Sequence, residues 1–165
     1  GLKSVAKLGF VQIPPYLIEK GEESLKKLLP RESKSKFTDL ALLSLIYPFN
    51  VVSEKIAREI VRHLEYHLER DRGVIRYKND RYYNKNEDET SEEAEWCFGL
   101  SWLSIIYNQF GDSEKSHEYL DKSLKTIYKD QIPELYYSDS DKPNDNIPLG
   151  WAEAMFVVAL LKAGK

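Results

Sequence analysis

The stretch from Trp96 to Phe110, WCFGLSWLSIIYNQF, carries apolar side chains on every side of a helical wheel. A helix of this kind must be buried all round, because no face of it is suited to water. The segment SEE at 91–93 precedes it as a helix start, and Gly111 closes it. The sequence therefore predicts a buried inner helix over residues 94–110.

Buried helices of this type alternate along the chain with amphipathic ones. Helices apolar on all sides are predicted at 38–47, 94–110 and 149–163, and helices with one polar face at about 16–29, 53–70 and 113–128. An amphipathic helix covers a buried one from outside, so three outer–inner pairs predict an all-α fold, part of an α/α toroid with about six helices. In a four-helix bundle or a tetratricopeptide repeat every helix would have one solvent-exposed face, so helices that are apolar on all sides argue against both folds. Strand structure is expected only in short pieces near 73–83.

Length and charge narrow the class of protein further. The 165 residues suit a single domain, 1–165. With 24 Lys+Arg against 27 Asp+Glu the net charge is −3, so the chain lacks the basic surplus of a nucleic-acid binder.

No apolar run reaches the ~18–20 residues of a membrane span, so no membrane partner is expected. One cysteine and no signal peptide favour the cytoplasm, although a signal further upstream would be invisible. Because no Met starts the sequence, we expect a processed chain or a piece of a longer one.

Three residues that could support chemistry have plainer explanations. His63 and His67 have the i, i+4 spacing of a zinc pair, but the segment HLEYH lacks the HExxH signature. Both flank the apolar stripe of their helix, which favours boundary positions over a metal site. Cys97 lies on an apolar helix, which favours an inert, buried thiol. No phosphate-binding loop or GxSxG elbow is present, so no metal or cofactor is expected.

Two long loops, rich in Tyr, Asn and Asp, each precede a buried helix and should lie at the same end of the fold. In the second loop, QIPELYY places Glu134 between proline and aromatic residues, an unusual position for a surface charge. A loop acid paired with Lys or Arg is an equally good explanation. The first loop offers hydrogen-bonding and stacking groups of the kind that bind sugars: Arg76, Tyr77, Asp80, Tyr82 and Tyr83.

Four motifs in order resemble the C-terminal part of glycoside hydrolase family 15: GVIRYKNDRYY, EAEWCFGLSWLSIIY, IPELYY and PLGWAEAMFVVALL. That family includes glucoamylases, glucodextranases and some trehalases, and phosphorylase kinase regulatory subunits carry a related domain. The resemblance covers roughly residues 37–164. It implies the C-terminal half of an (α/α)6 toroid that acts on α-glucosides.

The resemblance also implies roles for single residues. Glu134 matches the family's catalytic general base, which lies in the loop before the last inner helix. Arg76, Tyr77 and Asp80 match the residues that bind the non-reducing glucose. Trp96 and Trp151 match tryptophans at the starts of two inner helices.

The catalytic acid of such an inverting enzyme lies far upstream of the base, and no segment in residues 1–60 resembles its motif. Glu93 and Glu95 are the other acids near the presumed cleft, but at a helix start they should stay ionised. We therefore expect the isolated chain to be inactive. Because a half toroid leaves its apolar inner helices open along one edge, we also expect the chain to associate with a missing N-terminal half or with itself. The alternative is a non-catalytic, glucoamylase-like binding or regulatory module.

Overall fold

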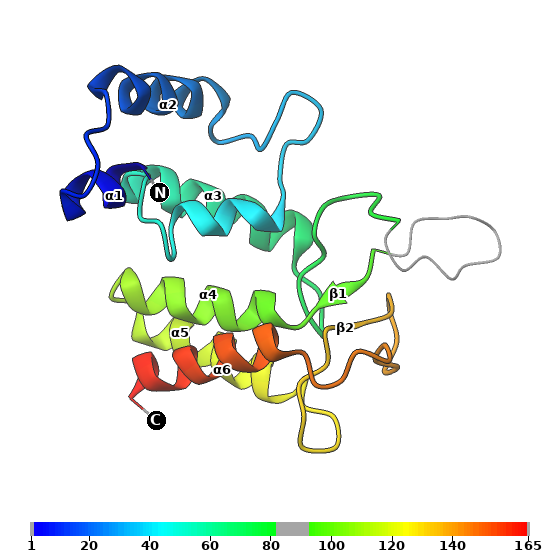
Figure 1. The fold of residues 1–165 in the computed structure, drawn as a ribbon. Coiled ribbons are helices and arrows are strands. Elements are labelled where there is room, and N and C mark those ends of the chain that lie inside the picture. Colours follow the sequence, from blue (N-terminus) through cyan, green and yellow to red (C-terminus); the bar gives the residue numbers. More distant parts are fainter. Residues whose placement is uncertain (1, 82–92, 165) are drawn as a thin grey trace. The chain divides into compact units, whose positions relative to one another are not determined.

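The computed structural model describes residues 2–81 and 93–164, and its contacts divide the chain into two compact units. The first unit, 1–37, holds helices α1 (Leu2–Leu8) and α2 (Pro15–Leu28). The second unit, 38–165, holds η1 (Leu40–Leu45), α3 (Glu54–Leu68), β1 (Glu95–Trp96), α4 (Phe98–Gln109), α5 (Ser113–Leu124), β2 (Leu135–Tyr136) and α6 (Gly150–Ala163), as Figure 1 shows. The single domain predicted for residues 1–165 stays a prediction; the two units are groups of internal contacts, 1–37 and 38–165.

In the first unit, α2 is the amphipathic helix predicted at 16–29. Pro15 lies in its first turn, where the missing N–H costs nothing, and the helix stops before Pro30. Lys26 and Lys27 lie in its last turn, next to the negative end of the helix dipole. None of its side chains is buried. The preceding helix α1 was not predicted from the sequence.

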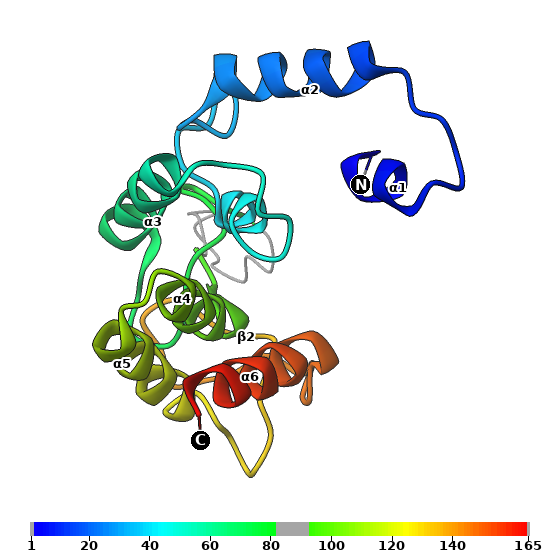
Figure 2. The same cartoon turned by 90° about the vertical axis from the view of Figure 1, so that its left-hand side faces the viewer.

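Helix α4 is the buried helix that the sequence predicts. Every residue from Phe98 to Tyr107 is buried. The helix packs against α5, α6 and η1, and Figures 1 and 2 show α4, α5 and α6 side by side. Small polar side chains hydrogen-bond to backbone carbonyls where α4 meets α5: Ser104 Oγ donates to the carbonyl of Ser116 at 2.8 Å, and Ser116 Oγ donates to the carbonyl of Ser104 at 3.0 Å. An all-α fold with a buried central helix is therefore confirmed.

The outer helices α3 and α5 also agree with the sequence pattern. Ser53 caps α3, and its Oγ accepts a hydrogen bond from Ile56 N. One apolar stripe of α3 is buried: Ala57, Ile60, Val61, Leu64 and Leu68. Helix α5 begins at Ser113 as predicted but ends at Leu124, four residues before the predicted end at 128; the side chain of Asp112 caps it by accepting from Lys115 N.

Two predicted elements differ from the structure. The segment 38–47 is not an α-helix but a short 3-10 helix, η1, capped by the Asp39 side chain and followed by turns up to Pro48. Only eight residues separate Asp39 from Pro48, which leaves room for little more than two α-helical turns. Its leucines are nevertheless buried, at 40, 42 and 43.

The helix predicted from residue 94 begins only at Phe98, because residues 95–96 form strand β1. This strand pairs antiparallel with β2, so both strands lie outside the 73–83 segment where strand structure was expected. Val74 contributes isolated bridges to Glu69 and Trp96. Glu93 has a left-handed φ of 46°, which is incompatible with a helix start there. The predicted opening residues Ser91 and Glu92 lie outside the described residues.

Helix α6 confirms the position of the third apolar helix but not its burial on all sides. Within this chain only Ala152 and Ala159 are buried. Val157 and Leu161 are exposed, Leu161 at 73%. One side of α6 packs against α4 and α5, and apolar side chains on other faces reach solvent.

Candidate functional site

Strand β1 brings the two long loops together directly before α4. Val74 and Trp96 exchange backbone hydrogen bonds of 3.1 Å, and the N–H of Cys97 donates to the carbonyl of Glu134 at 3.2 Å. Gly73 allows this approach, because a Cβ there would lie 2.6 Å from the backbone carbon of Glu95. The loop that carries Arg76 and the loop that carries Glu134 therefore flank the same short strand.

Arg76 and Asp80 form a bidentate ion pair on the first of these loops. Arg76 Nε lies 2.6 Å from Asp80 Oδ2, and Arg76 Nη2 donates to Oδ1 at 2.8 Å. Asp80 is only 1% exposed, whereas Arg76 and Tyr77 are half-buried. The Arg76 guanidinium also lies 4.9 Å from the centre of the Trp96 ring. The structure thus brings Arg76, Tyr77, Asp80 and Trp96 together, with Asp80 holding the guanidinium in place.

The two candidate tryptophans are linked by aromatic contacts at the starts of α4 and α6. Phe98 lies between them, edge-on to Trp96 with centroids 5.7 Å apart and stacked on Trp151 at 4.2 Å. Trp102 also approaches Trp151, at 6.1 Å. Trp96 is buried, but Trp151 is 52% exposed and is the more accessible of the two aromatic surfaces.

Glu134 lies half-buried in the second loop, immediately before β2. Its Oε2 accepts hydrogen bonds from the side-chain amides of Asn144 at 2.8 Å and Asn146 at 2.7 Å. The partners are therefore neutral amides, and not the Lys or Arg of an ordinary surface ion pair. Charge-assisted hydrogen bonds of this kind suit an ionised carboxylate.

The acids Glu93 and Glu95 do not open a helix, contrary to the sequence-based expectation. Glu93 accepts from Asn79 N at 2.8 Å and pairs with Arg70 at 3.3 Å. Glu95 is a buried strand residue, and burial raises the pKa of its carboxyl above the usual value, opposed by hydrogen bonds from the backbone N–H groups of Arg72 and Asp139. Helix-dipole reasoning fails here because β1 replaces the first turn of the expected helix.

Other candidates fall outside this site. Tyr82 and Tyr83 lie outside the described residues. The rings of His63 and His67 stack 6.2 Å apart, and no group of three metal-ligating side chains occurs within 2–81 and 93–164. Cys97 is buried, and this burial raises the pKa of its thiol to about 12, so the thiol stays protonated. Within the part of the chain that the structure describes, no helix is both long and apolar enough to cross a bilayer.

Sequence reasoning missed a polar cavity of about 930 Å³ beside the strands. It is lined by charged side chains from α3, α5 and the loops: Glu65, Glu69, Arg70, Asp71, Arg72, Glu95, Lys122, Lys125, Asp139 and Asp141, together with Ser140. Neither Glu134 nor Arg76 lines it. The spacing of Glu65 and Glu69 on one helix hinted at such a cluster, but its partners come from other helices.

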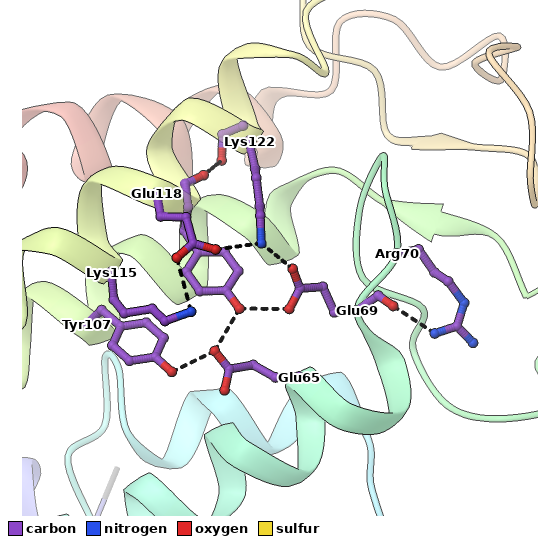
Figure 3. Close-up of polar contacts among 9 residues, drawn as sticks. Glu65, Glu69, Arg70, Tyr107, Lys115, Glu118 and Lys122 are labelled. Atoms are coloured by element: carbon purple, nitrogen blue, oxygen red, sulfur yellow. Dashed lines mark hydrogen bonds and ion pairs between the residues drawn. The ribbon is translucent and has the colours of Figure 1, made fainter.

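A network of short hydrogen bonds lies along this cavity, as Figure 3 shows. The Tyr107 hydroxyl donates to Glu65 at 2.6 Å, and the Tyr119 hydroxyl lies 2.7 Å from both Glu65 and Glu69. Lys122 Nζ contacts Glu69 at 2.6 Å. Burial and the neighbouring carboxylates raise the pKa of both tyrosines, so the phenols stay neutral donors. These contacts tie α3 to α4 and α5.

Comparisons with known sequences agree with this fold class. No family model matches the chain. An uncharacterized glycosyl hydrolase of Methanocaldococcus jannaschii is 26% identical over 91% of this chain and 25% of its own length. A probable phosphorylase b kinase regulatory subunit alpha of Caenorhabditis elegans is 29% identical over 92% of this chain and 15% of its own length. The chain thus spans a quarter or less of the length of these relatives.

Solved structures share this fold. A wild-type glycosidase superposes with a TM-score of 0.63 at 18% identity, covering 76% of this chain and 36% of that one. A glycosidase variant in complex with glucose gives a TM-score of 0.63 at 17% identity over the same shares. The chain therefore has a glycosidase-type (α/α) helical fold and corresponds to part of such a domain.

Proposed function

We propose that the chain is part of an inverting glycoside hydrolase that releases glucose from the non-reducing ends of α-glucosides. The observation that carries the proposal is that two loops flank strand β1 directly before α4: the loop with the Arg76–Asp80 pair, whose Val74 hydrogen-bonds to Trp96, and the loop with Glu134, whose carbonyl accepts from Cys97 N. A guanidinium and an aromatic ring on one loop, with a carboxylate on the neighbouring loop, would suit the binding of a sugar and a water molecule. The resemblance to glycoside hydrolase family 15 and the glycosidase-type fold support the same assignment.

In this mechanism Glu134 acts as general base. It removes a proton from the water that attacks the anomeric carbon, while an acid outside this chain protonates the leaving oxygen. Arg76 and Tyr77 bind sugar hydroxyls, and Asp80 contributes mainly by orienting Arg76, because it is almost fully buried. Trp151, half exposed, offers a stacking surface to a sugar ring, with Trp96 beneath Arg76.

The proposed partner is the N-terminal half of the same helical domain, or a second copy of this chain. The exposed apolar side chains of α6 support this, because large apolar residues such as Val157 and Leu161 are stabilised by a covering surface. The M. jannaschii relative is about four times as long as the matched segment, which allows for such a half.

The alternative function is a non-catalytic binding or regulatory module with a glucoamylase-like fold. The observation that favours it is the similarity to phosphorylase b kinase regulatory subunits from two further animals, with 28% identity over 84% of this chain in the Oryctolagus cuniculus protein. Such a module would hold a glycan or a protein without cleaving it.

The test compares the isolated chain with the chain assembled with its partner, using maltose and soluble starch. The isolated chain should release no glucose. In the assembly, Glu134→Gln should lower turnover by about 10²–10⁴-fold with glucose binding retained, since a lost general base has effects of that size. Glu153→Gln, a half-buried acid on α6, is the matched control and should stay active. An assembly that binds glucose but never hydrolyses an α-glucoside would favour the module instead.

A further inference from the structure

The loop that carries Glu134 folds back onto its own carboxylate. The side-chain amides of Asn144 and Asn146 both donate to Glu134 Oε2, at 2.8 Å and 2.7 Å. Two donors occupy both lone pairs of that oxygen. Glu134 Oε1 accepts no hydrogen bond from the residues that the structure describes. The two oxygens of one carboxylate are therefore in different environments.

Backbone hydrogen bonds fix the two amides relative to Glu134. Glu134 N donates to the carbonyl of Asn146 at 3.1 Å, and Asn144 N donates to the carbonyl of Leu135 at 3.1 Å. Because Leu135 lies in strand β2, the loop is anchored to the sheet that leads into α4. The carboxylate is thus held from both sides of a closed loop.

Asn144 is a poor choice for stability alone. It is 2% exposed, and its Oδ1 is buried with no hydrogen-bond partner among the described residues. An unsatisfied buried acceptor destabilises a fold, and an apolar side chain of similar size would avoid this cost. What the amide provides is its donor to Glu134, so its role is tied to that carboxylate.

We propose that Asn144 and Asn146 are positioning residues, which fix Glu134 Oε2 so that Oε1 faces the attacking water. This inference rests on the proposed role of Glu134 as general base. The water oxygen forms a bond to the anomeric carbon as the bond to the leaving oxygen breaks. One water proton passes to Glu134 Oε1, and an acid outside this chain supplies a proton to the leaving oxygen. A carboxylate free to rotate would reach this geometry only part of the time.

The hydrogen bonds can be tested on the 165-residue chain by NMR of its side-chain amides. Glu134→Gln replaces a charged acceptor by a neutral one, so the amide signals of Asn144 and Asn146 should both move. The control is Asn108, whose amide donates to the carbonyl of Lys162 at 2.9 Å and should not change. Unmoved signals for Asn144 and Asn146 would overturn the proposal at the structural level.

Kinetics of the active assembly test the positioning role. Asn144→Ala and Asn146→Ala should each lower kcat by about 10-fold or more, because small misplacements of a catalytic group have such effects, with KM nearly unchanged. Asp145→Ala, an exposed side chain between them, should have no effect. In the Glu134→Gln background the asparagine substitutions should cause no further loss.

The outcomes separate the two proposals. An active Glu134→Gln assembly would overturn the general base and the positioning role together. An inactive Glu134→Gln assembly with full kcat in both asparagine variants would leave the base in place and reject the positioning role. Thermal unfolding of each variant shows whether a lost activity reflects lost folding.

Discussion

Helices α4 and α6 are both rich in apolar residues, but their surroundings differ. Ten consecutive residues of α4 are buried, from Phe98 to Tyr107, whereas only Ala152 and Ala159 of α6 are. Helix α4 has packing partners in α5, α6 and η1, while α6 packs against α4 and α5. Apolar composition therefore predicts a need for burial, and the neighbouring elements decide whether one chain meets it.

The largest expected difference between the helices comes from truncating one leucine in each. Leu103 of α4 is fully buried, so Leu103→Ala should lower the free energy of unfolding by about 2–5 kcal/mol. Leu161 of α6 is mostly exposed, so Leu161→Ala should change the free energy of unfolding by less than about 0.5 kcal/mol. Urea unfolding of the isolated chain measures both. Equal losses would show that α6 is covered within the chain.

Two glycines, one in α4 and one in α6, allow a second comparison of how tightly the two helices are packed. In α4, a Cβ at Gly99 would lie 2.6 Å from Val74 Cβ, so Gly99→Ala should destabilise the chain by about 1–3 kcal/mol through overpacking. At the start of α6, a Cβ at Gly150 would meet nothing within 4 Å. Gly150→Ala should be neutral or slightly stabilising. Melting temperatures of the two variants test this, and a neutral Gly99→Ala would contradict the tight contact between α4 and Val74.

Association should depend on α6 and not on the outer helices. If the apolar side of α6 docks on a partner, Leu161→Lys should weaken association by about 10-fold or more, since burying a leucine contributes roughly 1.5–3 kcal/mol. Tyr66→Lys on α3 is the matched control, because Tyr66 is also highly exposed. Sedimentation velocity over a concentration series measures both. The same weakening for both substitutions would point to nonspecific contacts.

The smallest effect concerns pH at the start of α4, where Glu95 is buried. Burial raises the pKa of Glu95 in the folded chain above its value of 4.5, so the folded state binds more protons just above that pH. The contribution of Glu95 to stability is thus present below pH 4.5 and is lost as the pH rises through the folded-state pKa. The stability of Glu95→Gln relative to wild type should therefore improve between pH 4 and pH 7. A constant difference across this range would contradict the desolvation of Glu95.

Much of the fold follows from local sequence signals. Helices α3 to α6 combine a clear apolar pattern with a cap or a stop, such as Ser53 before α3 and Gly111 after α4. Strand β1 was not predicted, because the polar–apolar alternation of EAEW covers only four residues and its strand conformation depends on pairing with residues 135–136. The 3-10 form of η1 likewise depends on a short span before Pro48.

The candidate site was predictable in part. The motif around Glu134 and the loop with Arg76 are visible in the sequence, but the amides of Asn144 and Asn146 lie ten and twelve residues away and meet the carboxylate only when the loop folds back. That α6 in particular is exposed was not predictable, because no local pattern states which of two similar helices lacks a covering neighbour.

The central claim is that Glu134 activates water on the face of the sugar opposite the leaving group. The most direct test is proton NMR of the glucose first released from soluble starch by the active assembly, before the anomers equilibrate. Inversion at the anomeric carbon predicts that β-glucose appears first, and that the Glu134→Gln assembly releases none. α-Glucose as the first product would require a covalent intermediate on the enzyme and would contradict the account.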